Sequence, residues 1–193
     1  MIDEANKAMK SLSAVTISTR VTMKDGRWGS TRMRTDQKGT CSFTSAGSTG
    51  EKLEQIRIGS TDYIRPNLKH MQLSGVDTKG RKEQKNWVRT PVDPAVLARE
   101  NGLTDCTHPF ASFGKAAKGK AGKAGGGATL TLVVTDKEDK DGTYTFQVAT
   151  EGKPYIHQVV YESPEFRNVT TFSDFGTPLN VGPPKANVVN LPG

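Results

Sequence analysis

The chain has 193 residues, of which 34% are hydrophobic, and its 27 Lys and Arg residues against 20 Asp and Glu residues give a formal net charge of +7. A chain of this length can bury one sizeable core and fold as a single domain. No segment approaches the roughly 18 consecutive apolar residues of a membrane-spanning helix, and two cysteines are too few for a four-cysteine zinc site or a disulfide-dense miniprotein.

The first half of the chain predicts one short helix followed by paired strands. Apolar residues first recur at three- and four-residue steps, as in an amphipathic helix, at Ile2, Ala5, Met9 and Leu12. Apolar and polar residues then alternate. This alternation predicts strands, separated by turn sequences, over residues 15–23, 28–35, 40–45, 53–58 and 61–65.

The second half predicts helical segments and then more strands. Short helices are predicted around residues 68–71, 95–101 and 109–113, with a charged loop over 75–86 and an isolated strand over 86–89. Alternation returns over residues 129–135, 143–148, 155–161 and 169–172. Sequential strands with short turns pair antiparallel. The sequence therefore predicts an α+β fold, with one curved antiparallel sheet and helices laid over its apolar face.

The sequence offers no catalytic motif. His70, His108 and His157 lie in unrelated contexts without the spacing of a metal site, and no Gly-x-Ser-x-Gly elbow is present. The acidic cluster over 136–141 lacks the spacing of a calcium loop and is interpreted as a hairpin tip. We therefore expect a protein that is not an enzyme and that needs neither a cofactor nor a metal.

Residues 114–127 are rich in Lys, Gly and Ala. They match Gly-x-x-x-x-Gly-Lys, but Ala121 stands where a phosphate-binding loop needs a hydroxyl, so we interpret the segment as a flexible loop. Its four lysines form a cationic patch that attracts anionic surfaces. Basic residues elsewhere are dispersed and no recognition motif accompanies them, so nucleic acid is not an expected partner.

The two cysteines, Cys41 and Cys106, both lie in segments expected to be ordered. A disulfide between them would close a loop of 65 residues and stabilise the fold by roughly 4 kcal/mol in the chain-entropy model. Such a bond would also indicate an oxidising compartment. The alternative is two unpaired thiols in a cytosolic protein.

The order of several short motifs resembles the LppX/LprG-type lipoproteins of the actinobacterial cell envelope, which share the fold of the lipoprotein carrier LolA. The resemblance begins with the helix at residues 5–9 and the strand that starts at Ser13. It continues through Gly39-Thr-Cys41, Asp62-Tyr-Ile-Arg65 and Asn86-Trp-Val88. Its most specific part is the C-terminal run Thr171-Phe-Ser-Asp-Phe-Gly-Thr-Pro-Leu-Asn-Val181, followed by Pro183-Pro-Lys-Ala-Asn-Val188.

The resemblance implies one LolA-like domain over residues 1–193, with an open half-barrel sheet whose concave face is covered by short helices and encloses an apolar cavity. It implies a lipid or a lipidated molecule as partner. It also implies an extracytoplasmic location, with a removed signal peptide and a lipid anchor upstream of this chain, at the cell membrane.

Large apolar residues of the predicted strands and helices then become candidates for the cavity lining: Trp28, Met33, Phe43, Ile56, Tyr63, Met71, Trp87, Phe110, Phe113, Leu132 and Phe146. Two basic loops become candidates for contact with an anionic membrane surface: Lys79, Arg81, Lys82, Lys85, Lys115, Lys118, Lys120 and Lys123. Burial of acyl chains would contribute roughly 0.8 kcal/mol for each methylene.

An interaction or regulatory protein of the envelope is the alternative function. In that case the half-barrel is filled by its own side chains, and the basic surface binds a protein partner or an anionic polymer. The volume of the cavity inside the half-barrel distinguishes the two functions, since a ligand cavity needs several hundred cubic ångströms of largely apolar space.

Overall fold

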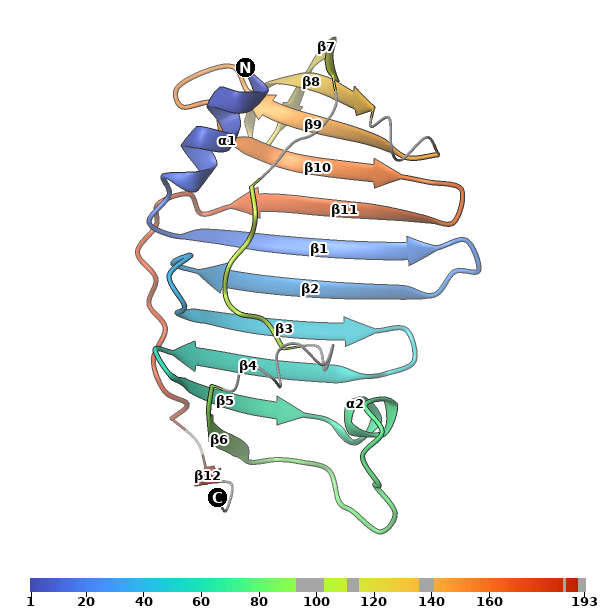
Figure 1. Ribbon diagram of the computed structural model, residues 1–193, viewed down its shortest axis with the longest axis vertical. Coiled ribbons are helices and arrows are strands. Elements are labelled where there is room, and N and C mark those ends of the chain that lie inside the picture. Colours follow the sequence, from blue (N-terminus) through green and yellow to red (C-terminus); the bar gives the residue numbers. More distant parts are fainter. Residues whose placement is uncertain (93–102, 111–114, 136–140, 186, 191–193) are drawn as a thin grey trace.

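The computed structural model describes residues 1–92, 103–110, 115–135, 141–185 and 187–190. Its strands join in one 12-stranded sheet in the order β12-β6-β5-β4-β3-β2-β1-β11-β10-β9-β8-β7 (Figure 1). The first half of the chain supplies β1 (Val15–Met23), β2 (Trp28–Thr35), β3 (Cys41–Gly47), β4 (Lys52–Ile58), β5 (Thr61–Pro66) and β6 (Trp87–Pro91). The second half supplies β7 (Lys115–Ala124), β8 (Gly127–Thr135), β9 (Thr143–Ala149), β10 (Ile156–Glu162), β11 (Phe166–Ser173) and β12 (Val188–Asn190).

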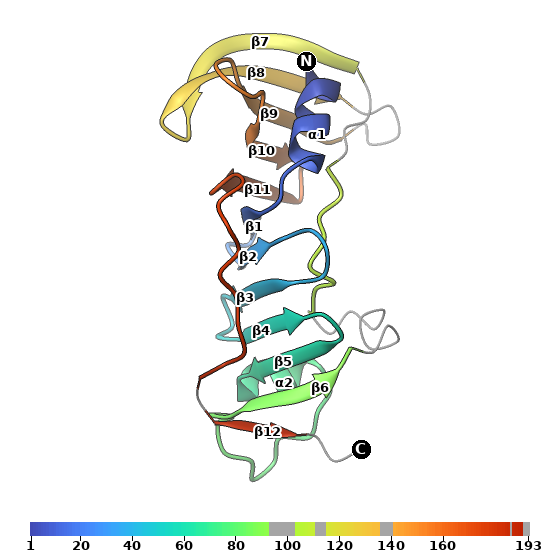
Figure 2. The same cartoon turned by 90° about the vertical axis from the view of Figure 1, so that its left-hand side faces the viewer.

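The two halves of the sheet meet at its centre, where β1 pairs antiparallel with β11. From β1 the first half extends strand by strand to β6, and the second half extends from β11 to β7. After β11 the chain follows the strand ends to the far end of the sheet, where β12 pairs parallel with β6 (Figures 1 and 2). The sheet is curved and its ends, β7 and β12, do not pair, so the predicted open sheet of an α+β fold is confirmed.

The core lies on the concave face. Here α1 (Ile2–Lys10) packs Ala5 and Met9, both fully buried, against the half of the sheet that contains β10 (Figure 2). Acidic residues in its first turn and Lys7 and Lys10 in its last turn match the helix dipole. The second helix, α2 (Leu68–Leu73), lies against β4 and β5; the side chain of its N-cap Asn67 accepts a hydrogen bond from the His70 amide at 2.8 Å.

The centre of the concave face is crossed by residues 103–110, which we call the strap, and these residues are not helical (Figure 1). The predicted helix over 109–113 therefore does not include Pro109 and Phe110, and its remainder lies outside the described residues. The same holds for the helix predicted over 95–101. Helices thus cover two parts of the concave face, and extended chain covers the middle.

The predicted flexible loop over 114–127 differs from the structure, because Lys115–Ala124 form strand β7. Its partner β8 presents Leu130, Leu132 and Val134 to the core, and the backbone ladder between the two strands compensates for the low β-propensity of Lys, Gly and Ala. Gly125 and Gly126 form the tight turn with φ of 60° and 84°, which glycine adopts without steric cost.

Candidate apolar binding site

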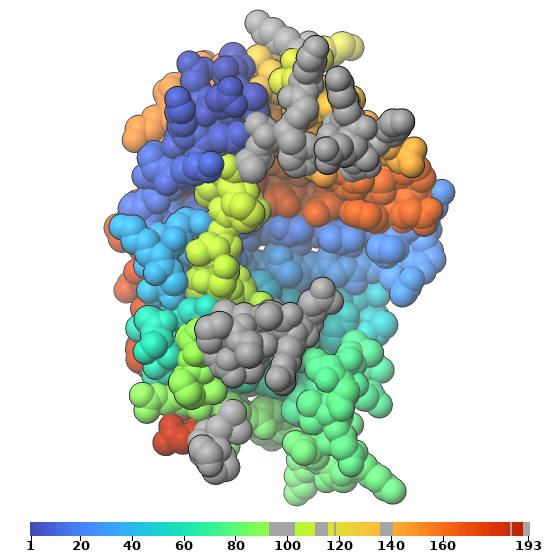
Figure 3. Space-filling model, in the orientation of Figure 1, coloured from blue at the N-terminus to red at the C-terminus, as the bar shows by residue number. Residues whose placement is uncertain are grey.

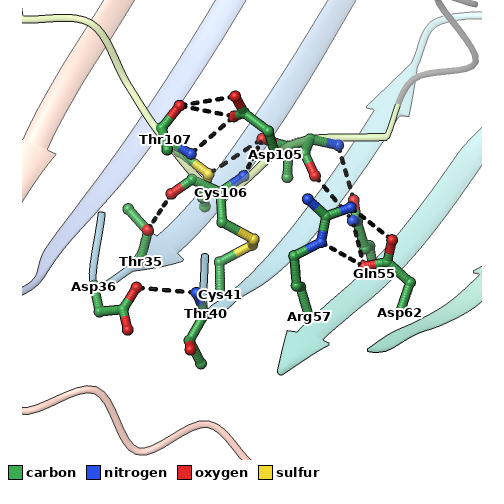
Figure 4. The surroundings of a disulfide bond; sticks show 12 residues. Thr35, Asp36, Thr40, Cys41, Gln55, Arg57, Asp62, Asp105, Cys106 and Thr107 are labelled. Carbon is green, nitrogen blue, oxygen red and sulfur yellow. Dashed lines mark hydrogen bonds and ion pairs between the residues drawn. A yellow bond between two sulfur atoms is a disulfide. The ribbon is translucent and has the colours of Figure 1, made fainter. Parts of the chain in front are cut away.

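The strap is fixed to the concave face by a disulfide and by hydrogen bonds (Figure 4). Cys106 is bonded to Cys41 of β3, with their Cα atoms 5.5 Å apart, and no free cysteine remains. Thr35 on β2 donates its hydroxyl to the Cys106 carbonyl oxygen, and the amide of His108 donates to Gln37 Oε1 at 2.9 Å. These bonds place this part of the strap across β2 and β3, and the disulfide interpretation of the cysteines is confirmed.

A buried polar network holds the other end of the strap. Gln55 on β4 donates to the Thr104 carbonyl oxygen at 3.0 Å and accepts from the Thr104 amide at 2.9 Å. Asp62 on β5 accepts from Gln55 at 2.9 Å and makes two bonds to the Arg57 guanidinium, at 2.8 and 2.6 Å. Both charged side chains are almost fully buried, so the loss of their hydration is compensated by the ion pair and its two hydrogen bonds instead of by water.

A first apolar pocket of about 180 Å³ opens beside the strap, between His108 and the inner faces of β9, β10 and β11. Figure 3 shows the concave face hollowed beside the strap, over β1 and β11. The walls of this pocket are mainly aromatic and aliphatic: Tyr144, Phe146, Val159, Tyr161, Asn168, Thr170 and Phe172. The strap and the second half of the sheet together therefore form a site for an apolar group.

Two polar groups of the first pocket are distinctive. Asn168 Oδ1 is buried and has no hydrogen-bond partner among the described residues, whereas the neighbouring Thr170 hydroxyl pairs with Thr19 at 3.1 Å. His108 packs edge-on against Phe110 and Phe172, with ring centroids 4.9 and 5.5 Å away. Burial lowers the pKa of His108 below its usual 6.5, so the imidazole is neutral at neutral pH.

A second pocket of about 140 Å³ lies on the other side of the strap, under α2. Leu103 of the strap, Leu53 of β4 and Met71 of α2 are among its lining residues, which are predominantly apolar. The second pocket and the first are thus separated by the disulfide-bonded strap.

The residues predicted to line a cavity fall into three groups. On the concave side, Met33, Phe43, Phe110, Leu132 and Phe146 are buried in the core, and Phe146 also lines the first pocket. Met71 lines the second pocket. Phe113 lies outside the described residues.

The third group lies on the outer face of the sheet, away from the core. The strand registers place Trp28, Ile56, Tyr63 and Trp87 on the face opposite to Met33, Phe43 and Leu53. The rings of Trp28 and Trp87 are covered by the guanidinium groups of Arg20 and Arg65, at 4.5 and 4.6 Å. These four residues therefore contact neither pocket.

Sequence reasoning missed most of the first pocket. The alternation of Tyr144 with Phe146 was a usable signal, since both side chains line it. On β10, however, the pairing with β9 shifts between Ile156 and Gln158, so simple alternation from the buried Ile156 does not identify Val159 and Tyr161 as inner residues. Asn168 is polar, so no hydrophobic pattern could identify it as a lining residue of the pocket.

The two predicted cationic loops do not lie together. Lys79, Arg81, Lys82 and Lys85 are exposed in the loop after α2, at one end of the molecule (Figure 1). Lys115, Lys118, Lys120 and Lys123 belong to β7 at the opposite end of the sheet, where the side chains of Lys120 and Lys123 are exposed.

Two further functional features are absent from the described residues. These residues contain no group of three or more His, Cys, Asp or Glu side chains placed to hold a metal ion. Among them, no helix is both long enough and apolar enough to cross a membrane.

Comparison with protein-family models and with curated protein sequences finds no match. Solved structures do match. Lipoprotein LppX of Mycobacterium tuberculosis superposes with a TM-score of 0.60 and 12% sequence identity, covering 94% of this chain and 96% of LppX. LprF from Mycobacterium bovis gives a TM-score of 0.58 and 13% identity, covering 94% of this chain and 93% of LprF. The chain therefore has the fold of LppX and LprF, as its sequence motifs predicted.

Proposed function

We propose that this protein binds a lipid or a lipidated molecule by inserting part of an acyl chain into the first pocket on its concave face. The observation that carries the proposal is the position of this pocket, between an aromatic sheet surface and a strap fixed by a disulfide. A preformed apolar pocket of this kind holds hydrocarbon by burial, without directional contacts. The likeness in fold to lipoprotein LppX supports a role in the envelope.

The size of the pocket limits how much of the ligand is enclosed. Its volume of about 180 Å³ is below the roughly 300 Å³ of typical small-molecule sites. We therefore propose that one chain end enters it and that the rest of the ligand lies in the open hollow. The second pocket, of about 140 Å³, would accept a second chain end beside Met71.

The proposed location is extracytoplasmic, at a membrane. The Cys41–Cys106 disulfide supports an oxidising compartment, and the sequence resemblance supports a lipid anchor upstream. The proposed role is binding without catalysis.

We further propose that the exposed Lys79, Lys82 and Lys85 contact anionic head groups. Replacing all three with Ser should then weaken binding to phosphatidylglycerol vesicles, and unchanged binding would exclude this contact.

Binding of a fluorescent long-chain fatty acid tests the proposal. Val159→Trp fills the first pocket, so we expect its affinity to fall by about tenfold or more, or about 1.4 kcal/mol. Thr145→Trp is the matched control, because Thr145 on β9 pairs with Val160 and faces away from the pocket. Equal affinity of the Val159→Trp variant and the wild type would overturn the proposal.

Native mass spectrometry of the protein purified from envelope membranes tests the cargo independently. A discrete mass excess that organic extraction removes, and that fragments as a lipid, is the expected result. If the protein carries no extractable mass and the fatty acid does not bind, the pockets of the concave face are not a lipid site and the protein has another function.

A further inference from the structure

The outer face of the sheet contains a hollow of about 720 Å³, which is larger than either pocket on the concave face. It extends across β11, β1, β2, β3 and β4, and we call it the outer trough. Its lining consists mainly of cationic and hydroxyl side chains. The proposed lipid site lies on the other face of the sheet and does not use this surface.

Four strands contribute the cationic groups of the outer trough: Arg167 from β11, Arg20 from β1, Arg32 from β2 and Lys52 from β4. The registers set these side chains on one face, with Arg20 opposite Ser30 and Arg32 opposite both Ser18 and Thr44. Adjacent strands lie about 4.8 Å apart, so the positive charges extend over about 20 Å across the strands.

Little of this positive charge is neutralised within the described residues. Glu54 is the acidic residue of the lining, and it is paired with Arg65 at 2.7 Å. Arg167 is paired at the rim with Glu162 at 2.8 Å. In the remaining cations the side chains contact neutral groups or solvent. Arg32 donates to the Ser18 hydroxyl at 3.3 Å, Arg20 lies over Trp28, and Lys52 is exposed.

The position of the trough determines how a partner can bind it. All five strands are paired on both sides, so a partner cannot add as a further strand and must bind through side chains. Guanidinium groups bind carboxylates through two parallel hydrogen bonds, and the trough hydroxyls donate one more. Its hollow shape does not fit a flat membrane. Trp28, which could stack a nucleic-acid base, is covered by Arg20.

We propose that the outer trough binds an acidic segment of a partner protein in an extended conformation. Alternate carboxylates of such a segment point to one side at intervals of about 7 Å, so about three of them fall within the roughly 20 Å over which the long cationic side chains are distributed. The trough then accommodates about six extended residues across its width. Val169 and Ala46 are the aliphatic residues of the lining, and the backbone of the segment would pass over them.

Fluorescence anisotropy with a labelled peptide that alternates Glu and Ser tests this inference. We expect the peptide to bind with an affinity that falls as salt is raised, and a matched peptide that alternates Gln and Ser not to bind. The double substitution Arg20→Ser/Arg32→Ser should weaken binding by about tenfold. Lys7→Ser/Lys10→Ser removes the same charge from α1 on the concave face and should change affinity by less than about twofold.

Three results would overturn the inference. One is the absence of Glu-peptide binding to the wild type at low salt. Another is an equal loss of affinity in the two double variants, which would indicate an effect of net charge alone. The third is tighter binding of polyphosphate or of phosphatidylglycerol vesicles that Arg20→Ser/Arg32→Ser abolishes, which would assign the trough to a polymer or a membrane. None of these results depends on fatty-acid binding.

Discussion

Gln55 of β4 and Thr104 of the strap bind each other through two hydrogen bonds, so that the Gln55 amide pairs with the backbone as a neighbouring strand would. The same amide group donates to Asp62, which in turn binds Arg57. A polar side chain on the concave face thus serves as the attachment point of the strap. Because the first and second pockets lie on either side of the strap, this network and the adjacent disulfide shape both of them.

Loss of the disulfide should lower the stability of the whole fold. Cys41→Ser/Cys106→Ser opens a loop of 65 residues, and we expect the free energy of unfolding to fall by about 4 kcal/mol. Urea denaturation of the variant and of the oxidised and reduced wild type measures this. The reduced wild type should resemble the double variant, and a loss below about 1 kcal/mol in both would show that hydrogen bonds alone hold the strap.

The buried ion pair should be costly to break from one side. Asp62→Ala leaves the Arg57 guanidinium buried without its carboxylate, and we expect a loss of about 3–5 kcal/mol in the free energy of unfolding. Arg57→Met/Asp62→Leu should lose less, because no charge remains buried. Glu162→Ala, which breaks the exposed pair with Arg167, should cost at most about 1 kcal/mol. Similar losses for Asp62→Ala and Glu162→Ala would contradict the assigned burial.

The sheet could be predicted because its hairpins combine strict alternation with turn sequences. In β1 and β2, for example, Val15 and Ile17 face the core with Met33, as their spacing indicates. The helix α1 was predictable for the same reason, from the spacing of Ala5 and Met9. In these elements the hydrophobic periodicity that predicts the structure is complete within a few neighbouring residues.

The faces of β4 to β6 could not be predicted, because polar residues hold core positions there. Gln55 and Arg57 are buried on the concave face, so Ile56 between them points outward. From side-chain polarity alone, Ile56 was expected to face the core and Gln55 and Arg57 to face solvent. The polar residues are stable inside only because Asp62 on the neighbouring strand β5 and Thr104 of the strap satisfy them, and Thr104 is far from Gln55 in the sequence. Alternation identifies two faces but does not show which of them a later segment will cover.

Protonation of His108 should destabilise the protein at mildly acidic pH. Burial lowers its pKa in the folded state below the unfolded value of 6.5, so the unfolded chain binds more protons between the two values. The free energy of unfolding should therefore decrease as the pH falls through this window, starting near 6.5. His108→Gln should have a shallower pH dependence between about pH 7 and about pH 5.

Urea denaturation at both pH values measures this difference. His157→Gln is a useful comparison, because burial also lowers the pKa of His157 but that histidine lies outside the first pocket. Only the His108 variant should also change the pH dependence of fatty-acid binding. Identical stability profiles for the wild type and His108→Gln would contradict the inferred burial of a neutral imidazole.

The unpaired Asn168 oxygen should give the proposed lipid site a preference for ligands with a hydrogen-bond donor. Its Oδ1 atom is buried in the first pocket, where a ligand hydroxyl could donate to it. A neutral hydrogen bond contributes about 1 kcal/mol, so a fatty acid hydroxylated near its chain end should bind about fivefold more tightly than its parent. In Asn168→Leu this preference should disappear while the parent acid still binds, because the leucine side chain keeps the wall apolar.

Thr170→Val is the matched control, since the Thr170 hydroxyl is already paired with Thr19 and should not contribute to selectivity. Competition of both acids against the fluorescent probe measures the ratio; an unchanged ratio in Asn168→Leu would show that the hydroxyl binds elsewhere.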